Sequence, residues 1–258
     1  MSRPVAMITG ASSGIGRACA AECARDGFDV AIAARRTDDL ESLAESIAGD
    51  HDCQVMVRGV DLHDHEETVR IVPEVLERFG RLDALLNVAG VADMTPLHEM
   101  SLGSLQRTLV VNTIAPALLV REAWPALVKA PRAVVINISS LASIDPLPGG
   151  GAYGMSKSAI EGLMRSIHVE SAASGAGIRS FALAPGCIDT PMLRSALDGI
   201  ELPDGAEIPM DEFVGHVMDC VQGVHDDFDG QTIFVAREGH FSRDVADTKA
   251  ALQDLWGG

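Results

Sequence analysis

Short apolar segments alternate with longer segments of helical periodicity along the whole chain. The apolar segments, rich in Val, Ile and Ala, contain few polar residues, so they predict strands that are covered on both faces. Strands are expected at 4–9, 29–34, 53–60, 83–88, 133–139, 178–184 and 231–235. Helices are expected at 14–26, 38–48, 64–79, 101–129, 152–174 and 210–222.

The regular order of strand and helix predicts an α/β protein built from stacked βαβ units with right-handed crossovers. We therefore expect a doubly wound parallel sheet of about seven strands with helices on both faces. No break in composition marks a linker, so residues 1–258 are interpreted as a single domain.

Two segments interrupt this order. Residues 186–210 are rich in proline, glycine and apolar side chains, and loops of this length inside a compact domain are usually functional. The tail, about 240–258, carries apolar residues at helical spacing, which indicates a short packing or interface helix.

The charge balance excludes several classes of function. The chain has 37 Asp and Glu against 20 Lys and Arg, a net charge of -17, and so acidic a surface repels phosphate backbones and anionic membranes. We expect no nucleic-acid partner and no membrane association. The five cysteines form no C-x-x-C pair, which favours a reducing compartment, and the start of the chain lacks the apolar core of a signal peptide. A cytoplasmic protein is expected.

A glycine-rich turn, Gly10-Ala-Ser-Ser-Gly14-Ile-Gly16, follows the first expected strand and precedes a helix. Glycines permit a tight turn and a close backbone approach, and the start of the helix offers free N–H groups to phosphate oxygens. The alternative is a turn that only packs helix against strand. Because the turn opens a series of βαβ units, we favour dinucleotide binding.

The second expected strand ends in Arg35-Arg36, where many dinucleotide folds have a carboxylate for the adenosine ribose hydroxyls. Guanidinium groups suit a 2′-phosphate through bidentate, charge-assisted hydrogen bonds. The pair therefore indicates a preference for NADP(H). The alternative is a pair of solvated arginines at the start of a helix.

Tyr153 is the one tyrosine of the chain, and Lys157 follows it on the same face of an expected helix, about one turn away. A free phenol, with a pKa of ~10, is a poor acid–base catalyst at neutral pH. An ammonium at ~4 Å, in an effective dielectric of ~20, would favour the phenolate by at most ~4 kcal/mol and bring that pKa towards ~7. Taken alone, the Y-x-x-x-K spacing is equally that of a surface helix pair.

Two further polar residues support a reactive site. Ser140 follows the fifth expected strand, whose carboxyl end would meet the ligand crevice of a doubly wound sheet, so Ser140 and Tyr153 can converge. Asn112 lies in the long fourth helix, one turn before a proline. Such a helix-disturbing residue either stabilises a local kink or orients a water molecule beside Lys157.

The ordered set of motifs resembles the short-chain dehydrogenase/reductase family, in its compact single-domain branch. The resemblance covers residues 5 to about 235 and is far more specific than any one motif. It implies a Rossmann fold. The matching motifs are T-G-x-x-x-G-I-G at 9–16, Asp61-Leu62, Asn87-Val-Ala-Gly90, Asn112, Ser140, Tyr153 with Lys157, and Pro185-Gly186.

The resemblance implies an oxidoreductase that interconverts a carbonyl and a secondary alcohol. We expect NADP(H) as the cofactor, with NAD(H) as the alternative, and a small carbonyl or alcohol molecule as the substrate. The expected cofactor-binding residues are Gly10, Ser12, Ser13, Gly14, Ile15, Gly16, Arg35, Arg36, Asp61, Leu62, Asn87, Ala89, Gly90, Tyr153, Lys157, Pro185, Gly186, Ile188 and Thr190.

The implied catalytic residues are Asn112, Ser140, Tyr153 and Lys157. Tyr153 would exchange a proton with the substrate oxygen, and Ser140 would hold that oxygen. Lys157 would lower the phenol pKa and bind the nicotinamide ribose, while Asn112 would hold a water molecule. Residues of about 190–210 would close over the substrate as a lid. A less favoured alternative is a nucleotide-binding sensor without turnover, although such proteins usually lose the tyrosine or the lysine.

Some positions depart from the family pattern. Ser13 stands where many NADP-preferring members carry a basic residue, and an extension replaces the usual V-D-G-G ending. A dimer or tetramer through the helices 101–129 and 152–174 is implied by analogy only. No metal is expected, because His63 and His65 alternate instead of lying one helical turn apart. Steroids, sugars, acyl groups and small ketones all remain open as substrates.

Overall fold

The computed structural model describes residues 3–197 and 202–256; residues 198–201, within the expected lid, lie outside the described residues. The described chain forms a sheet of seven strands, paired in parallel in the order β3-β2-β1-β4-β5-β6-β7. Every expected strand is confirmed to within about two residues at each end. The strands are β1 Val5–Thr9, β2 Asp29–Ala34, β3 Val55–Gly59, β4 Ala84–Asn87, β5 Val134–Ile138, β6 Arg179–Pro185 and β7 Thr232–Val235.

Helices connect the strands, and none of those in the described ranges is long and apolar enough to cross a membrane. Five of the six expected helices are found as continuous helices close to their expected ranges. The helices are α1 Gly14–Arg25, α2 Thr37–Asp50, α3 His65–Phe79, α4 Leu102–Leu109, α5 Ala115–Leu127, α6 Gly151–Ser174, α7 Pro191–Leu197, α8 Met210–Gln222 and α9 Val245–Trp256.

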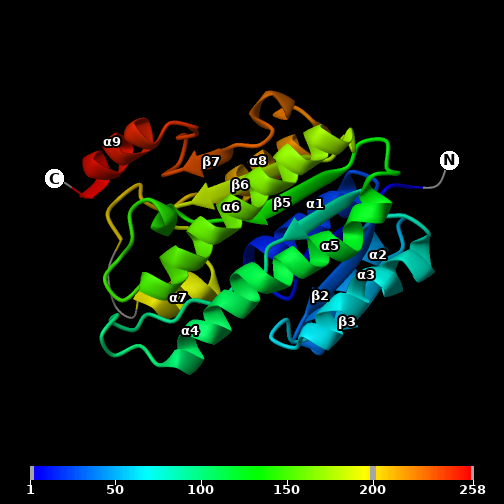
Figure 1. Ribbon diagram of the computed structural model, residues 1–258, viewed down its shortest axis with the longest axis horizontal. Helices are drawn as coiled ribbons and strands as arrows, with labels where there is room; N and C mark the ends of the chain where they lie inside the picture. Colours follow the sequence, from blue (N-terminus) through cyan, green and yellow to red (C-terminus); the bar gives the residue numbers. More distant parts are fainter. Residues whose placement is uncertain (1–2, 198–201, 257–258) are drawn as a thin grey trace.

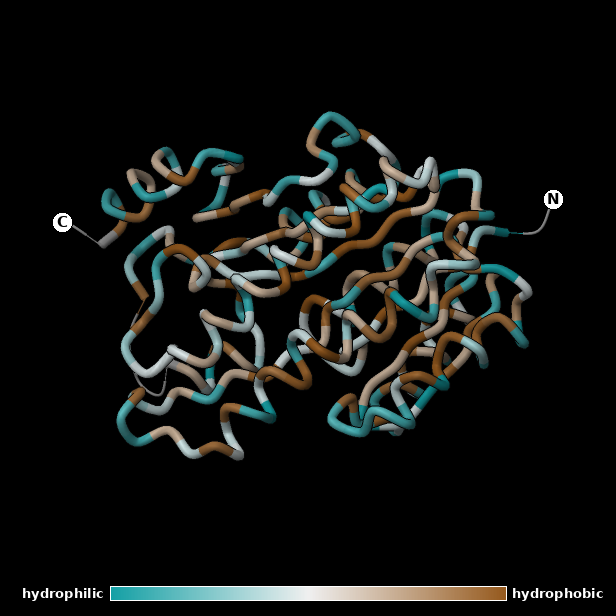
Figure 2. Tube along the Cα trace, viewed as in Figure 1, coloured by the Kyte–Doolittle hydropathy of each residue, from teal (hydrophilic) through white to brown (hydrophobic). Residues whose placement is uncertain are grey.

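The helices cover both faces of the sheet and enclose two apolar cores (Figure 1). On one face, α1, α2 and α8 pack over strand side chains such as Ile8 and Ile32. On the other face, α3, α5 and α6 pack over strand side chains such as Met7 and Leu85. Consecutive side chains of a strand point to opposite faces, so the apolar runs fill both cores at once. Figure 2 shows these hydrophobic strands inside a more polar surround of helices and loops.

The expected continuous helix over 101–129 is wrong. α4 ends at Leu109, a π-helical turn spans Val110–Ile114, and α5 begins at Ala115. Pro116 has no N–H for the carbonyl of Asn112, which weakens the α-helical hydrogen-bond ladder at this point. Turns of this kind are rare, occur mostly as single bulges inside α-helices, and are frequent at functional sites.

The segment expected to be a lid contains a short helix that the sequence did not predict. α7 begins at Pro191, and the Thr190 hydroxyl caps it by accepting a hydrogen bond from the Leu193 amide at 3.2 Å. Proline is well tolerated in the first turn of a helix, so a residue that we interpreted as a loop former instead opens one. Further along, the Ile208 amide donates to the Cys187 carbonyl oxygen at 2.7 Å, which returns the chain to the end of β6.

The tail forms the helix that its spacing predicts, α9, at the β7 edge of the molecule (Figure 1). Phe234 of β7 and Ser242 exchange two backbone hydrogen bonds, at 2.8 and 2.9 Å, so the chain doubles back along the strand before the helix starts. Ala251 of α9 is then buried in a small apolar cluster with Phe234.

Large apolar side chains are exposed on the helical segments where the resemblance places subunit contacts. Leu102, Ile114 and Val169 are 68%, 42% and 62% exposed. Such residues suit an interface, although scattered exposed apolar residues are normal on monomers. The dimer or tetramer therefore stays a prediction.

Candidate active site

A cavity of about 360 Å³ opens at the carboxyl ends of the strands. The loops that follow β1, β2, β4, β5 and β6 all contribute to its lining. β1 lies between β2 and β4, so the strand order reverses at this point. Doubly wound sheets bind their ligands at such a reversal, outside the carboxyl ends of the strands.

The turn after β1 comes too close to its neighbours to carry side chains at Gly10 and Gly16. Gly10 has a φ of +71°, and a Cβ added there would lie 2.8 Å from the Ala89 Cα. A Cβ added at Gly16 would lie 2.5 Å from the Gly10 carbonyl oxygen. α1 begins at Gly14, and Ser13 before it makes no capping hydrogen bond with its side chain. The free amides of this helix start fit a pyrophosphate.

Arg35 and Arg36 both line the cavity, but their contacts differ. Arg36 pairs with Asp39, one helical turn further along α2. Arg35 is exposed and forms no hydrogen bond or ion pair with any described residue. Of the two guanidinium groups, Arg35 is therefore the one that could bind a phosphate without first breaking an ion pair.

Ser140, Tyr153 and Lys157 meet at the cavity from two elements. Ser140 follows β5, and Tyr153 and Lys157 lie in the first two turns of α6. A side-chain hydrogen bond joins Ser140 to Tyr153. α6 approaches this closely because Gly154 has no side chain: a Cβ there would lie 2.6 Å from the Ala142 carbonyl oxygen.

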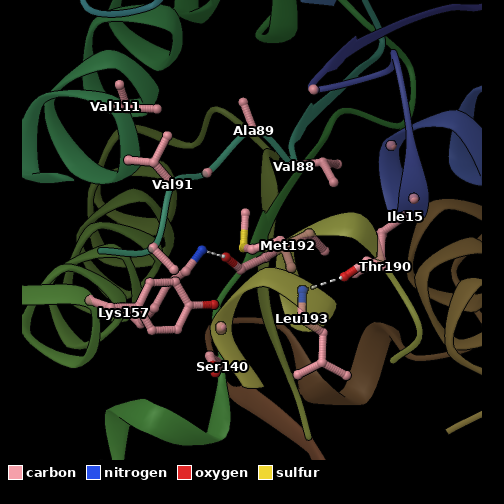
Figure 3. A pocket seen from close by; sticks show the side chains of 18 of the residues that line it. Ile15, Val88, Ala89, Val91, Val111, Ser140, Lys157, Thr190, Met192 and Leu193 are labelled. Carbon is pink, nitrogen blue, oxygen red and sulfur yellow. Dashed lines mark hydrogen bonds between the residues drawn. The ribbon is translucent and has the colours of Figure 1, made fainter. Parts of the chain in front are cut away.

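The Lys157 ammonium lies under the same cavity. Its Nζ donates to the Ile138 carbonyl oxygen at 2.8 Å and lies 5.4 Å from the centre of the Tyr153 ring. Figure 3 shows the Lys157 amine and Ser140 on the side of the cavity that faces Met192. A proton donor, a hydroxyl and a cation thus share one wall.

Burial moves both titratable groups towards their neutral forms. Lys157 is 4% exposed, and burial lowers the pKa of its ammonium to about 8. Burial also raises the pKa of the Tyr153 phenol, and the hydrogen bond with Ser140 opposes this increase. The lower phenol pKa expected from a lysine at ~4 Å is therefore not found, because Nζ is bound to a backbone carbonyl and desolvation dominates at both groups.

Two expected site residues do not line the cavity. The Asn112 side chain accepts from the Val91 amide at 2.8 Å, and donates to the Val91 carbonyl at 2.9 Å and to the Ser156 hydroxyl at 3.0 Å. It therefore stabilises the π-helical turn and holds the loop after β4. Asn87 pairs instead across the sheet with Asn137 of β5, at 2.9 Å.

The remaining residues that the sequence motifs and the family resemblance predict for the site all line the cavity. They are Gly10, Ser12, Ser13, Gly14, Ile15, Gly16, Arg35, Arg36, Asp61, Leu62, Ala89, Gly90, Ser140, Tyr153, Lys157, Pro185, Gly186, Ile188 and Thr190.

The sequence did not predict several other residues of the cavity lining. Met94, Arg107, Asp145 and Leu147 come from loops and a helix that carry no motif, and Leu252 comes from α9. The helical spacing of the tail could reveal an apolar face there, but only the fold shows that this face reaches the cavity. The tail is thus part of the site wall.

The parallel sheet, the glycine turn at its reversal point and the tyrosine–lysine pair define a Rossmann-type oxidoreductase site. A family model described as short chain dehydrogenase matches residues 4–200. The chain therefore belongs to the short chain dehydrogenase family, and it is an NAD(P)-dependent enzyme acting on CH–OH or C=O groups.

Individual relatives are similar over most of their length. 2-(R)-hydroxypropyl-CoM dehydrogenase of Xanthobacter autotrophicus is 35% identical over 217 residues, which cover 82% of this chain and 86% of that protein. An alcohol dehydrogenase from the archaeon Thermococcus sibiricus, solved with 5-hydroxy-NADP, is 28% identical with a TM-score of 0.80, covering 91% of this chain and 96% of that one. A putative NAD(P) dependent gluconate 5-dehydrogenase from Beutenbergia cavernae, with bound NADP at low occupancy, is 29% identical with a TM-score of 0.82, covering 91% and 95%.

The buried charge of Lys157 should destabilise the cofactor-free protein below pH 8. Its pKa falls from 10.5 to about 8 on folding, so the unfolded chain holds more protons between these values and the free energy of unfolding rises with pH there. We expect Lys157→Met to be more stable than the wild type at pH 7, by up to about 3 kcal/mol less the lost hydrogen bond. The difference should shrink as the pH approaches 10.5.

Urea unfolding at pH 7 and pH 10 measures this difference directly. Lys129→Met, at an exposed lysine, is the matched control and should show the same stability difference at both pH values. A Lys157→Met protein that is destabilised equally at pH 7 and pH 10 would show that the ammonium is not held at a desolvation cost.

Proposed function

We propose that this protein is an NADP(H)-dependent oxidoreductase that interconverts a carbonyl and a secondary alcohol, with Tyr153 as general acid and base. The observation that carries the proposal is the meeting of Ser140, Tyr153 and Lys157 at the cavity that also holds the glycine turn. The binding elements and the acid–base groups thus share one space, as hydride transfer to a carbonyl requires.

Each polar group in this wall has a task that its position suits. The bound nicotinamide supplies the hydride. Tyr153 donates its phenolic proton to the carbonyl oxygen as negative charge grows there, and the Ser140 hydroxyl donates a hydrogen bond to the same oxygen. The Lys157 ammonium supplies positive charge beside the phenolate that forms. In alcohol oxidation, the phenolate takes the proton back.

Arg35 supports NADP(H) over NAD(H). Its guanidinium lies at the cavity rim, free of ion pairs among the described residues, at the end of β2 where the adenosine ribose of a bound dinucleotide would lie. The related Thermococcus sibiricus and Beutenbergia cavernae structures contain NADP or a derivative of it. Ser13 supplies no charge of its own, so Arg35 carries most of the expected preference.

The substrate end of the cavity favours a compound with an apolar portion. Val91, Met94, Leu147 and Leu252 line it together with Met192 of α7. Met192 reaches across to the catalytic wall, since its Cε would lie 3.7 Å from a Cβ added at Gly90. We propose that the segment of about 190–210 closes over an apolar alcohol or ketone and excludes water.

Replacing Tyr153 by Phe should abolish most of the turnover. We expect kcat to fall by about 10²- to 10⁴-fold, because the hydroxyl that exchanges the proton is gone while the ring remains. NADPH-coupled assays on a panel of apolar ketones, aldehydes and 3-oxoacyl compounds measure the loss. NADPH affinity, followed by fluorescence, should change little, and Ser158→Ala, at an exposed position of α6, is the matched control.

The pH dependence of the wild-type enzyme provides a second test of Tyr153. Because burial raises the phenol pKa, the protonated form dominates at neutral pH, so carbonyl reduction should be favoured there and alcohol oxidation should rise with pH. A Tyr153→Phe protein that retains more than about a tenth of the wild-type kcat would reject Tyr153 as the acid.

Replacing Arg35 by Ala should weaken the binding of NADPH and leave the binding of NADH nearly unchanged. Loss of a charged hydrogen-bonding group should raise KM for NADPH by about 10- to 100-fold and leave kcat/KM with NADH nearly unchanged. Arg36→Ala is the matched control, and its effect should be smaller because that guanidinium is already paired with Asp39. Equal losses with both cofactors would refute phosphate recognition, and a wild-type preference for NADH would favour the NAD(H) alternative.

Shortening the Leu252 side chain should weaken the binding of the substrate and leave the binding of the cofactor unchanged. We expect Leu252→Ala to raise KM for an apolar ketone by about five- to tenfold, since the leucine loses apolar contact area at the cavity wall. Leu255→Ala, on the same helix but outside the cavity lining, should leave KM near its wild-type value. Equal effects of the two variants would mean that α9 acts through stability alone.

A further inference from the structure

Two histidines and an aspartate gather around the carboxyl end of α8, outside the cavity. His216 and Asp219 lie about one turn apart on the helix, and His225 lies in the turn that follows it. One ligand atom from each residue lies within 4.8 Å of those of the other two. We propose that these three residues bind one divalent transition ion of the zinc class.

The backbone after α8 winds back and brings His225 to Asp219. Gly223 ends the helix with a φ of +91°. The amides of Gly223, Val224 and His225 all donate to the Asp219 carbonyl oxygen, at 3.0, 2.8 and 3.3 Å. An α-helix continued to residue 225 would instead carry that side chain about 240° around the axis from Asp219. The juxtaposition is therefore a product of the turn, which explains why the sequence spacing did not reveal it.

Ion pairs hold this turn in place. Asp226, next to His225, pairs with Arg132 at 3.1 Å and with Arg179 at 2.5 Å. Arg179 also donates to the Cys220 carbonyl oxygen at 2.9 Å, which ties the same guanidinium to α8. Two of the ligand-bearing elements are thus fixed to one another independently of any ion, as a preorganised site requires.

Two imidazole nitrogens in the cluster lack hydrogen-bond partners although they are buried. They are His216 Nδ1 and His225 Nε2. Buried polar atoms in proteins nearly always have a partner, so these two nitrogens, which belong to one cluster with a carboxylate, need an explanation. A bound cation would supply a partner for a nitrogen lone pair.

The spacing of the cluster suits a tetrahedral ion. His225 Nε2 lies 3.4 Å from Asp219 Oδ2 without forming a hydrogen bond. Two ligands of one tetrahedral zinc ion, with bonds of about 2.0–2.2 Å, lie about 3.3–3.5 Å apart. The His225 and Asp219 atoms already have this separation, and the His216 atom is within 4.8 Å of both.

Aromatic rings cover the two histidines on one side. Phe241 stacks on His216 and on His225, with ring centroids 4.6 and 4.9 Å apart, and Phe228 lies 5.2 Å from His225. Asp219 keeps 39% of its side chain exposed, which leaves an entry route for the ion.

Such an ion would fasten the end of α8 to the following turn. Three protein ligands leave a fourth position for water, and the set of two imidazoles and one carboxylate is typical of zinc. Because none of the three residues lines the cavity, the ion would stabilise the fold and take no part in the reaction at Tyr153.

Metal titration of the tag-free, chelator-treated full chain tests the proposal. We expect one zinc ion per chain by calorimetry, a rise in thermal midpoint with added zinc, and the visible spectrum of tetrahedral cobalt when Co²⁺ replaces zinc. Asp219→Asn and His225→Gln should each weaken zinc binding by at least about tenfold and remove the thermal shift. Turnover of both variants should stay at the wild-type level.

The matched control is His98→Gln. His98 and Glu99 form a surface pair with 3.3 Å between nitrogen and oxygen, close to the His225–Asp219 spacing, but His98 is 81% exposed and belongs to no three-residue cluster among the described residues. This variant should bind zinc as the wild type does. Failure of the wild type to bind zinc, or unchanged binding in both Asp219→Asn and His225→Gln, would overturn the proposal. Asp219→Asn preserves size at a partly exposed position, so its result stands even if His225→Gln folds poorly.

Discussion

All seven strands of the described chain run in one direction, so the loops that leave their carboxyl ends crowd along one edge of the sheet. That direction follows from the helices, which cover both faces and turn each strand back to the same starting edge. Gly10, Ala89 and Ser140 are far apart in the sequence. They line the same cavity because the strands that precede them all end at this edge. The chemistry of the protein therefore depends on two apolar cores that contain none of its reactive groups.

At that edge, the exclusion of water strengthens the binding of a polar substrate group but destabilises charged side chains. The crevice that strengthens hydrogen bonds to a substrate oxygen also destabilises the Lys157 ammonium and the Tyr153 phenolate. The Ile138 carbonyl and the Ser140 hydroxyl compensate only in part. A tyrosine and a lysine on one helix face do not by themselves form an acid–base pair. The groups around them determine whether the phenol and the amine are protonated.

The sequence predicted the sheet closely because apolar runs on buried strands are a local signal. Most of the predicted site residues line the cavity as well, because motif residues such as Gly10 and Ser140 lie directly at strand ends. The failures have non-local causes. The π-helical turn depends on Asn112 meeting Val91 from another loop, and Leu252 reaches the cavity only once α9 folds back beside β7. The His216–His225 cluster likewise needs a left-handed Gly223.

The Asn112 amide links three parts of the molecule that the chemistry uses separately. It grips both backbone groups of Val91, in the substrate wall, and donates to Ser156, which directly precedes the buried lysine. The Val91 loop and the helical turn before Lys157 are therefore held by the same side chain. One uncharged amide thus joins the apolar wall to the helix that carries Tyr153 and Lys157, and a reshaped Val91 loop would also change the support of that helix.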